Sequence, residues 1–113
     1  MNKEASILNT VKSMLGPSED YPAFDTDIIV HINSAFERLC ELGVGPAEPF
    51  SIESSEETWK DFTSDVTWQT IRYIVLYVKN IFDPTANSVI KQAYKEEIDK
   101  LEWTMNSVSE VGY

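Results

Sequence analysis

The sequence predicts a small all-α domain, and three observations lead to that prediction. Apolar residues recur at helical spacing in several segments, helix-breaking residues separate these segments, and the chain contains no repeats or low-complexity stretches. A chain of 113 residues can bury one hydrophobic core but has no room for a second. We therefore expect a single domain over residues 1–113, a small bundle of four main helices and one short helix with a prominent middle loop.

Two amphipathic helices are expected in the first half of the chain. The first extends over residues 3–15, where apolar residues recur every three to four positions, and Gly-Pro at 16–17 supplies its stop. The second follows a helical apolar stripe over residues 28–42 and ends before a glycine. We expect the side chains of Asp25 and Thr26 to cap its first amides.

The middle loop follows the second helix. Residues 43–55 contain two Gly and two Pro, so they cannot be helical throughout. Residues 50–52 can be extended and can pair briefly with another segment or another chain. Ser54 and Glu57 have the spacing of a capping box, which predicts that a short helix with two aromatic residues begins there and ends near Thr63.

Two further helices are expected in the second half of the chain, at residues 68–82 and 86–106. Apolar and aromatic residues cover more than one face of the first, which is typical of a central helix between two neighbours. Its β-branched residues also allow a strand over residues 71–78 as the lesser alternative. Residues 107–113 are interpreted as a disordered tail. The apolar face of the final helix consists of Val89, Ile90, Ala93, Tyr94, Ile98, Leu101 and Met105.

Charge and cysteine content exclude several classes of protein. Nine Lys plus Arg against nineteen Asp plus Glu give a net charge of −10, which argues against a protein that neutralises nucleic-acid phosphates. A single cysteine cannot form an internal disulfide, and one histidine leaves little for a zinc cluster. The sequence shows no signal peptide and no membrane span, so we expect a protein that is made and stays in a reducing cytoplasm.

The residues that could carry catalysis are few. His31 lies at the edge of an apolar stripe, where a boundary residue is commoner than a general base. Cys40 on the same helix is interpreted as a small buried hydrophobic residue. No spacing indicates a paired-carboxylate site, a phosphate-binding loop or an EF-hand. We therefore expect a protein that is not an enzyme and that has no catalytic residues, no cofactor and no metal site.

The negative charge is unevenly distributed. Residues 1–50 carry three basic and eight acidic groups, residues 51–66 one and five, and residues 67–113 five and six. The corresponding net charges are −5, −4 and −1, so an acidic surface is expected around the middle loop. A solvated loop is the ordinary explanation of such a charge run. The candidate acidic channel or docking surface consists of Glu53, Glu56, Glu57, Asp61 and Asp65.

Aromatic residues outside an apolar stripe are candidate interface anchors. Trp103 is the best candidate, because it lies off the stripe of Ile98, Leu101 and Met105. Five Phe, five Tyr and three Trp in so short a chain also favour self-association. For the aromatic residues of the short helix, a position over the core is the favoured alternative. The candidate interface as a whole consists of Trp103, Trp59, Phe62, Phe50 and Ile52.

A collinear set of motifs from about residue 6 to residue 106 resembles the small head-tail connector (head completion adaptor) proteins of tailed bacteriophages and prophages. Two features depart from that pattern: Thr85 stands where relatives often have a second proline, and the segment between Phe62 and Trp68 is short. The motifs are Phe24-Asp25-Thr26-Asp27-Ile28, Leu42-Gly43-Val44-Gly45-Pro46, Phe50-Ser51-Ile52, Thr58-Trp59-x-x-Phe62, the run from Tyr73 to Val78 with Phe82-Asp83-Pro84, and Leu101-Glu102-Trp103-x-x-Asn106.

The resemblance implies a structural protein of the phage neck in the virion. Family members assemble as a ring-shaped, dodecamer-like homo-oligomer on the portal protein, extend the DNA channel, and offer a docking place to a stopper or tail-completion protein. DNA passes through such a ring without specific binding. The residues leave open an alternative function, an acidic helical phage-encoded inhibitor or DNA mimic that binds a basic partner. The nearly balanced charge of the C-terminal half tells against that alternative.

Overall fold

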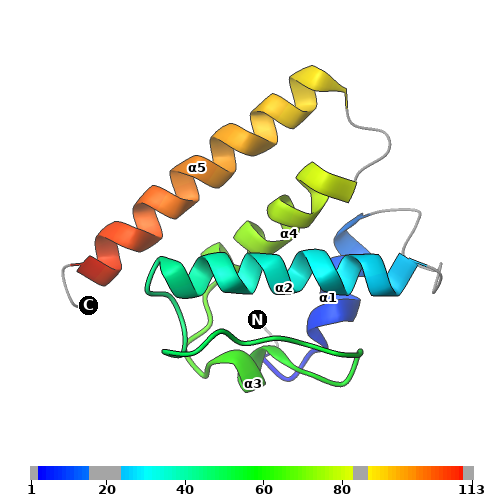
Figure 1. Cartoon of the computed structure of the whole chain (residues 1–113), viewed down its shortest axis with the longest axis vertical. Coiled ribbons are helices and arrows are strands. Elements are labelled where there is room, and N and C mark those ends of the chain that lie inside the picture. The colour runs from blue at the N-terminus through cyan, green and yellow to red at the C-terminus, as the bar shows by residue number, and fades with distance from the viewer. Residues whose placement is uncertain (1–2, 16–23, 83–86, 111–113) are drawn as a thin grey trace.

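The computed structural model describes residues 3–15, 24–82 and 87–110 of the chain. Within these ranges it contains five helices and no strand, so the predicted all-α fold is confirmed. The Gly-Pro pair at 16–17 and the last three residues lie outside the described ranges. The helices are α1 (Ile7–Leu15), α2 (Asp25–Glu41), α3 (Trp59–Phe62), α4 (Trp68–Phe82) and α5 (Ser88–Glu110), as Figure 1 shows.

Helix α4 is central, as its apolar residues on more than one face predict, and the alternative of a strand over residues 71–78 is wrong. It packs against α2, α5 and α1. The C-terminal ends of α2 and α5 lie near one another, whereas the first half of α5 extends away from α2 and α3 (Figure 1). The largest fully buried side chains are Trp59, Tyr73, Phe36, Ile7, Ile28, Ile32, Leu39, Ile52, Ile71, Ile74, Val11 and Val78.

Helix α1 begins four residues later than predicted, because the backbone before it pairs with the chain that leads into α3. Ser6 and Thr58 form an isolated antiparallel bridge. The amide of Ile7 donates to the carbonyl of Glu57 at 3.0 Å, and the amide of Trp59 donates to the carbonyl of Ala5 at 3.3 Å. Extended pairing and helical geometry are incompatible at the same residues, so the helix starts at Ile7.

Helix α2 has the predicted extent but not the predicted first cap. Phe24 occupies the N-cap position without a side-chain hydrogen bond, so the expected capping by Asp25 and Thr26 is wrong. Asp25 instead forms an ion pair of 2.8 Å with Lys12 of α1. At the other end, Gly43 has a φ of 81°, and the hydrogen bonds from its amide and the next one close a Schellman motif that only glycine adopts readily.

The middle segment, residues 43–58, is the prominent loop that the sequence predicts. Residues 50–52 do not pair with another segment within the described chain, because a side chain of α2 takes the backbone groups of Ile52. Asn33 accepts from the amide of Ile52 at 2.8 Å and donates to the carbonyl of Ile52 at 3.0 Å. The ring of Phe50 contacts Phe36 of α2, with centroids 5.1 Å apart. These contacts hold the segment against α2.

Helix α3 starts four residues after the predicted capping box. Thr58 and Asp61 form the box that begins it, with each side chain accepting a hydrogen bond from the other residue's backbone amide. Ser54 and Glu57 also bond, since the Ser54 amide donates to the Glu57 carboxylate at 3.2 Å, but this contact closes a turn. The helix ends at Phe62, next to the predicted end.

Helix α5 is longer than predicted at its C-terminal end, and only part of its predicted apolar face is buried. It continues to Glu110, so the expectation of disorder is wrong for residues 107–110. Its predicted apolar face is buried only in the second half, at Ile98, Leu101 and Met105. The first half extends beyond the contact with α2, which leaves Val89 76% exposed. The core therefore uses one half of the face that periodicity indicates.

Candidate interaction surfaces

Three of the predicted interface residues lie in the core. Trp59 is 1% exposed, and its indole nitrogen donates to the hydroxyl of Thr10 at 3.2 Å. Phe62 and Ile52 are also buried, and Phe50 is half-buried against the rings of α2 and α3. Because almost none of their surface is exposed, Trp59, Phe62 and Ile52 are core residues rather than exposed anchors. The core alternative, which the sequence favoured for the tryptophan and Phe62, is the correct one.

Trp103 lies on the surface, with 73% of its area exposed. It follows the buried Leu101 by two residues, a rotation of about 200° around the helix axis, so its indole lies on the side of α5 opposite the core. Residues four, seven and eleven positions before it share that side. These residues are all exposed, and with the tryptophan they form the outer α5 row: Gln92, Glu96, Asp99 and Trp103.

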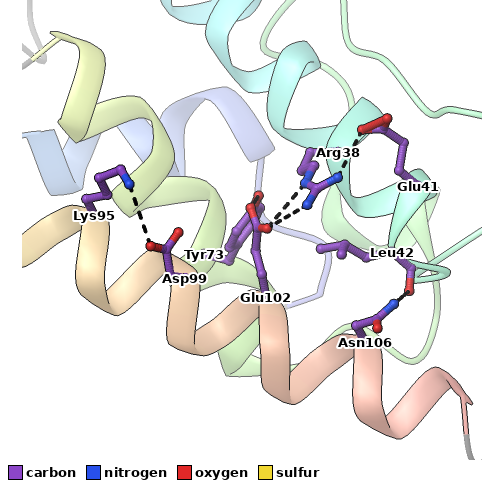
Figure 2. A network of polar contacts seen from close by, with 8 residues as sticks. All are labelled: Arg38, Glu41, Leu42, Tyr73, Lys95, Asp99, Glu102 and Asn106. Atoms are coloured by element: carbon purple, nitrogen blue, oxygen red, sulfur yellow. Dashed lines mark hydrogen bonds and ion pairs between the residues drawn. The ribbon is translucent and has the colours of Figure 1, made fainter.

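A polar network holds the part of α5 that carries Trp103 (Figure 2). The Glu102 carboxylate accepts from Nη2 of Arg38 at 2.9 Å and from the phenolic hydroxyl of Tyr73 at 2.7 Å. Asn106 donates to the carbonyl of Leu42 at 3.4 Å, one turn further along. Arg38 also approaches Glu41 at 3.5 Å. These contacts join α2, α4 and α5 and determine which side of α5 faces outward.

The network shifts the pKa values of its members in the directions that their contacts require. Burial opposes ionisation of Glu102, but the hydrogen bonds from Arg38 and Tyr73 outweigh it and lower its pKa. Burial and the hydrogen bond to the charged Glu102 raise the pKa of Tyr73 far above its usual value. The hydrogen bond to Glu102 raises the pKa of Arg38. Glu102 is therefore a carboxylate at neutral pH, and Tyr73 is a neutral donor.

The candidate acidic residues divide into two groups in the structure. Glu53, Glu56, Glu57 and Asp61 line one shallow hollow, which we call the acidic hollow. Asp65 lies at the turn between α3 and α4 beside a separate groove. Asp61 caps α3. Burial opposes ionisation of Glu57, but the amides of Glu53 and Ser54 donate to its carboxylate and lower its pKa. Both residues therefore have a structural role.

Glu53 and Glu56 have the opposite character. Both side chains are exposed, and within the described residues neither carboxylate takes part in a hydrogen bond or an ion pair. Lys60, the one cation of the acidic segment, is also exposed and is not paired with them in that part of the chain. These two carboxylates are therefore free to act on a partner.

Sequence reasoning missed one surface, a groove of about 490 Å³ between the end of α1 and α4. Trp68 is 59% exposed and Met14 is 41% exposed there. The sequence signal for this groove was that apolar residues lie on more faces of α4 than its neighbouring helices cover. We call this surface the α1–α4 groove, and it is lined by Met14, Trp68, Ile71, Arg72, Val75, Leu76 and Lys79.

Within the described ranges, no cluster of three His, Cys, Asp or Glu side chains could hold a metal ion. Cys40 is half-buried rather than buried, and its thiol donates to the carbonyl of Ala47 at 3.4 Å. None of the helices in the described ranges has the length and apolar character needed to cross a membrane.

One known protein family matches nearly the whole chain. A family model described as phage connector protein matches residues 7–112, a range that contains the acidic hollow, the α1–α4 groove and the outer α5 row. No curated protein and no solved structure matches the chain significantly.

Proposed function

Because this chain belongs to the phage connector protein family, we propose that it forms a ring-shaped adaptor between the portal vertex and the tail or a stopper protein. The family is one of structural proteins that associate with other head and tail proteins in the virion neck. The observation that carries the proposal is the family match over residues 7–112. In this role the ring extends the DNA channel during packaging and ejection.

The unpaired carboxylates of the acidic hollow support the proposal that this surface faces passing DNA without binding it. Each copy contributes Glu53 and Glu56, and a closed ring repeats these charges around its axis. Repetition of unpaired negative charges repels the phosphates of a passing duplex. Screening over about 8 Å at physiological salt limits the effect to the immediate surface, so it acts on sliding rather than on long-range attraction.

The same hollow supports a second use within the connector role. A stopper or tail-completion protein with a basic patch would find two unpaired carboxylates at an accessible place. Charge complementarity of this kind gives specificity and a faster association rate. The inhibitor or DNA-mimic alternative has no specific observation in its favour, and the family match supports the connector role instead.

Charge removal at the hollow distinguishes the channel from the docking role. The variant Glu53→Gln/Glu56→Gln keeps Glu57 and Asp61, which the fold needs. Particles carrying it should retain or leak DNA abnormally with normal tail joining if the hollow faces the channel. Tail-less heads filled with DNA would instead support docking. A matched variant, Asp27→Asn/Glu37→Gln, removes two exposed carboxylates from α2 and should behave as the wild type.

The ring itself is tested by binding to a purified portal ring from the same phage. We expect the wild-type chain to sediment with the portal and to form a ring visible by electron microscopy. Failure to bind the portal, combined with fully infectious particles from a genome that lacks this chain, would overturn the proposed function.

A further inference from the structure

We propose that the outer α5 row of one copy seats in the α1–α4 groove of a second copy. This inference rests on the ring proposed above and names the two surfaces that join neighbouring subunits. Each surface leaves a tryptophan mostly exposed, Trp103 on the row at 73% and Trp68 in the groove at 59%. A large exposed aromatic side chain is typical of an interface anchor.

The two surfaces are complementary in shape. The outer α5 row is a convex helix surface from which one indole projects, and the groove is a hollow of about 490 Å³ along α4. The groove presents apolar side chains, among them Met14 and Leu76, to whatever enters it. A helix laid along such a groove is a recurrent mode of recognition between helical proteins.

The two surfaces are also complementary in charge. Glu96 and Asp99 are the charged members of the row, and Arg72 and Lys79 are the charged members of the groove. In the described chain Lys79 has no ion-pair partner, and Arg72 has an exposed contact of 3.1 Å with Glu97. Asp99 has an exposed contact of 3.8 Å with Lys95 of its own helix, whereas Glu96 has no ion-pair partner in the described chain. The row therefore presents the Glu96 carboxylate to a groove whose charged members are cations.

The spacing of these groups gives a register for antiparallel helices. Arg72 and Lys79 are seven residues apart on α4, which corresponds to two turns and a rise of about 10.5 Å. Glu96 and Trp103 are also seven residues apart on α5. When Trp103 of one copy lies at Arg72 of the next, Glu96 lies at Lys79. The guanidinium then meets an indole, a favourable cation–π pair, and the ammonium meets a carboxylate.

The position of the two surfaces makes the contact intermolecular. Helix α5 packs on α4 through Ile98, Leu101 and Met105, so its outer row points away from the groove of its own copy. Each copy thus has one row and one groove to offer to different neighbours. A contact between unlike surfaces produces a closed ring when the rotation closes and a filament when it does not. A second copy is therefore the occupant that matches both surfaces at once.

Zero-length cross-linking tests the register directly. A carbodiimide joins carboxylates to lysine amines, and an equal mixture of ¹⁴N and ¹⁵N chains separates links between copies from links within one. We expect mixed-isotope peptides that join Glu96 or Asp99 to Lys79, with the chain alone and on the portal ring. Absence of such peptides from both samples overturns the inference. Portal binding that persists in that case leaves the proposed function standing, and loss of portal binding removes both.

Two variants test that the contact joins unlike surfaces. Trp103→Ala removes the anchor from the row, and Met14→Glu places a charge in the groove at an exposed position. Each alone should weaken self-association at least tenfold, measured by light scattering, while its circular-dichroism melt stays that of a folded protein. Mixed together they retain one intact contact and should form dimers and nothing larger. Val30→Ala, an exposed α2 control, should assemble as the wild type.

Mixing the two variants also has an outcome that would contradict the inference. Equal failure of the mixture and of the separate variants would show a contact between like surfaces and would overturn the inference. Cross-links from Lys79 to a portal or tail protein, without links between copies, would assign the groove to another partner and would also overturn it. Wild-type assembly by both single variants would do the same.

Discussion

The phenolic hydroxyl of Tyr73 donates a hydrogen bond of 2.7 Å to the carboxylate of Glu102 and thereby joins α4 to α5. Arg38 of α2 donates to the same carboxylate at 2.9 Å. One anionic side chain therefore connects three helices, as Figure 2 shows. The next residue along the chain is the exposed Trp103. The contact that stabilises the bundle also determines which side of α5 presents that tryptophan.

Loss of the Glu102 charge should destabilise the fold. Glu102→Gln removes the negative charge to which Arg38 and Tyr73 donate hydrogen bonds. Hydrogen bonds to charged groups contribute about 1.5–3 kcal/mol each. We expect a fall of about 1–3 kcal/mol in the free energy of unfolding, measured by urea denaturation. Glu96→Gln on the exposed row is the control and should change it by less than about 0.5 kcal/mol. Equal effects of the two variants would contradict the role of the network.

The stability of the protein should fall in acid. The folded-state pKa of Glu102 is lowered from its ordinary 4.5, so the unfolded chain binds more protons between the two values. Its contribution is fully present above the unfolded pKa and is lost as the pH falls through the folded one. Glu57 acts in the same direction. Denaturation between about pH 7 and pH 3 should show a shallower acid loss for Glu102→Gln than for the wild type, and parallel curves would refute this.

Gly45 should not tolerate a side chain. Its φ is +88°, and an added Cβ would lie 2.5 Å from Cζ of Phe62. Gly45→Ala combines a backbone cost of about 1–2 kcal/mol with this clash. Thermal melts should show the Gly45→Ala cost reduced in a Phe62→Leu background, because the smaller side chain frees space. An equal cost of Gly45→Ala in both backgrounds would show that the clash with the Phe62 side chain does not cause the destabilisation.

Asn33 should hold the middle segment against α2. The Asn33 side chain bonds the amide of Ile52 at 2.8 Å and the carbonyl of Ile52 at 3.0 Å. Asn33→Ala leaves both backbone groups without this partner. An unsatisfied buried group costs about 1–3 kcal/mol. Hydrogen exchange of the Ile52 amide should accelerate strongly in this variant. In Ser34→Ala, a change on the same helix, exchange at Ile52 should stay at the wild-type rate.

The two tryptophans of opposite exposure should behave oppositely. Trp59→Ala empties a site that is 1% exposed and should cost about 3–5 kcal/mol of folding free energy. Trp103→Ala should leave the melting temperature of the monomer nearly unchanged and weaken assembly. A large loss of monomer stability in Trp103→Ala would show that this residue belongs to the core.

Local patterns predicted the helices well and their ends less well. The extent of α4 and the glycine stop of α2 follow from neighbours in sequence, so periodicity and turn chemistry indicate them. The start of α1 depends on pairing between Ser6 and Thr58, which are distant in sequence. The capping box of α3 also differs from the predicted one, because two pairs with the right spacing, Ser54 with Glu57 and Thr58 with Asp61, follow one another and only the second begins a helix.

The sequence by itself determined the all-α fold, the acidic middle segment, the family resemblance and Trp103 as a side chain off the apolar stripe. Only the tertiary structure decided that Trp59, Phe62 and Ile52 are core residues, that Glu57 and Asp61 serve the fold, and that Trp68 lies in a groove. The physical reason is that helix periodicity reports which residues share a face, whereas burial depends on which neighbour covers that face. That neighbour is chosen by contacts between distant segments, such as those that Glu102 makes with α2 and α4.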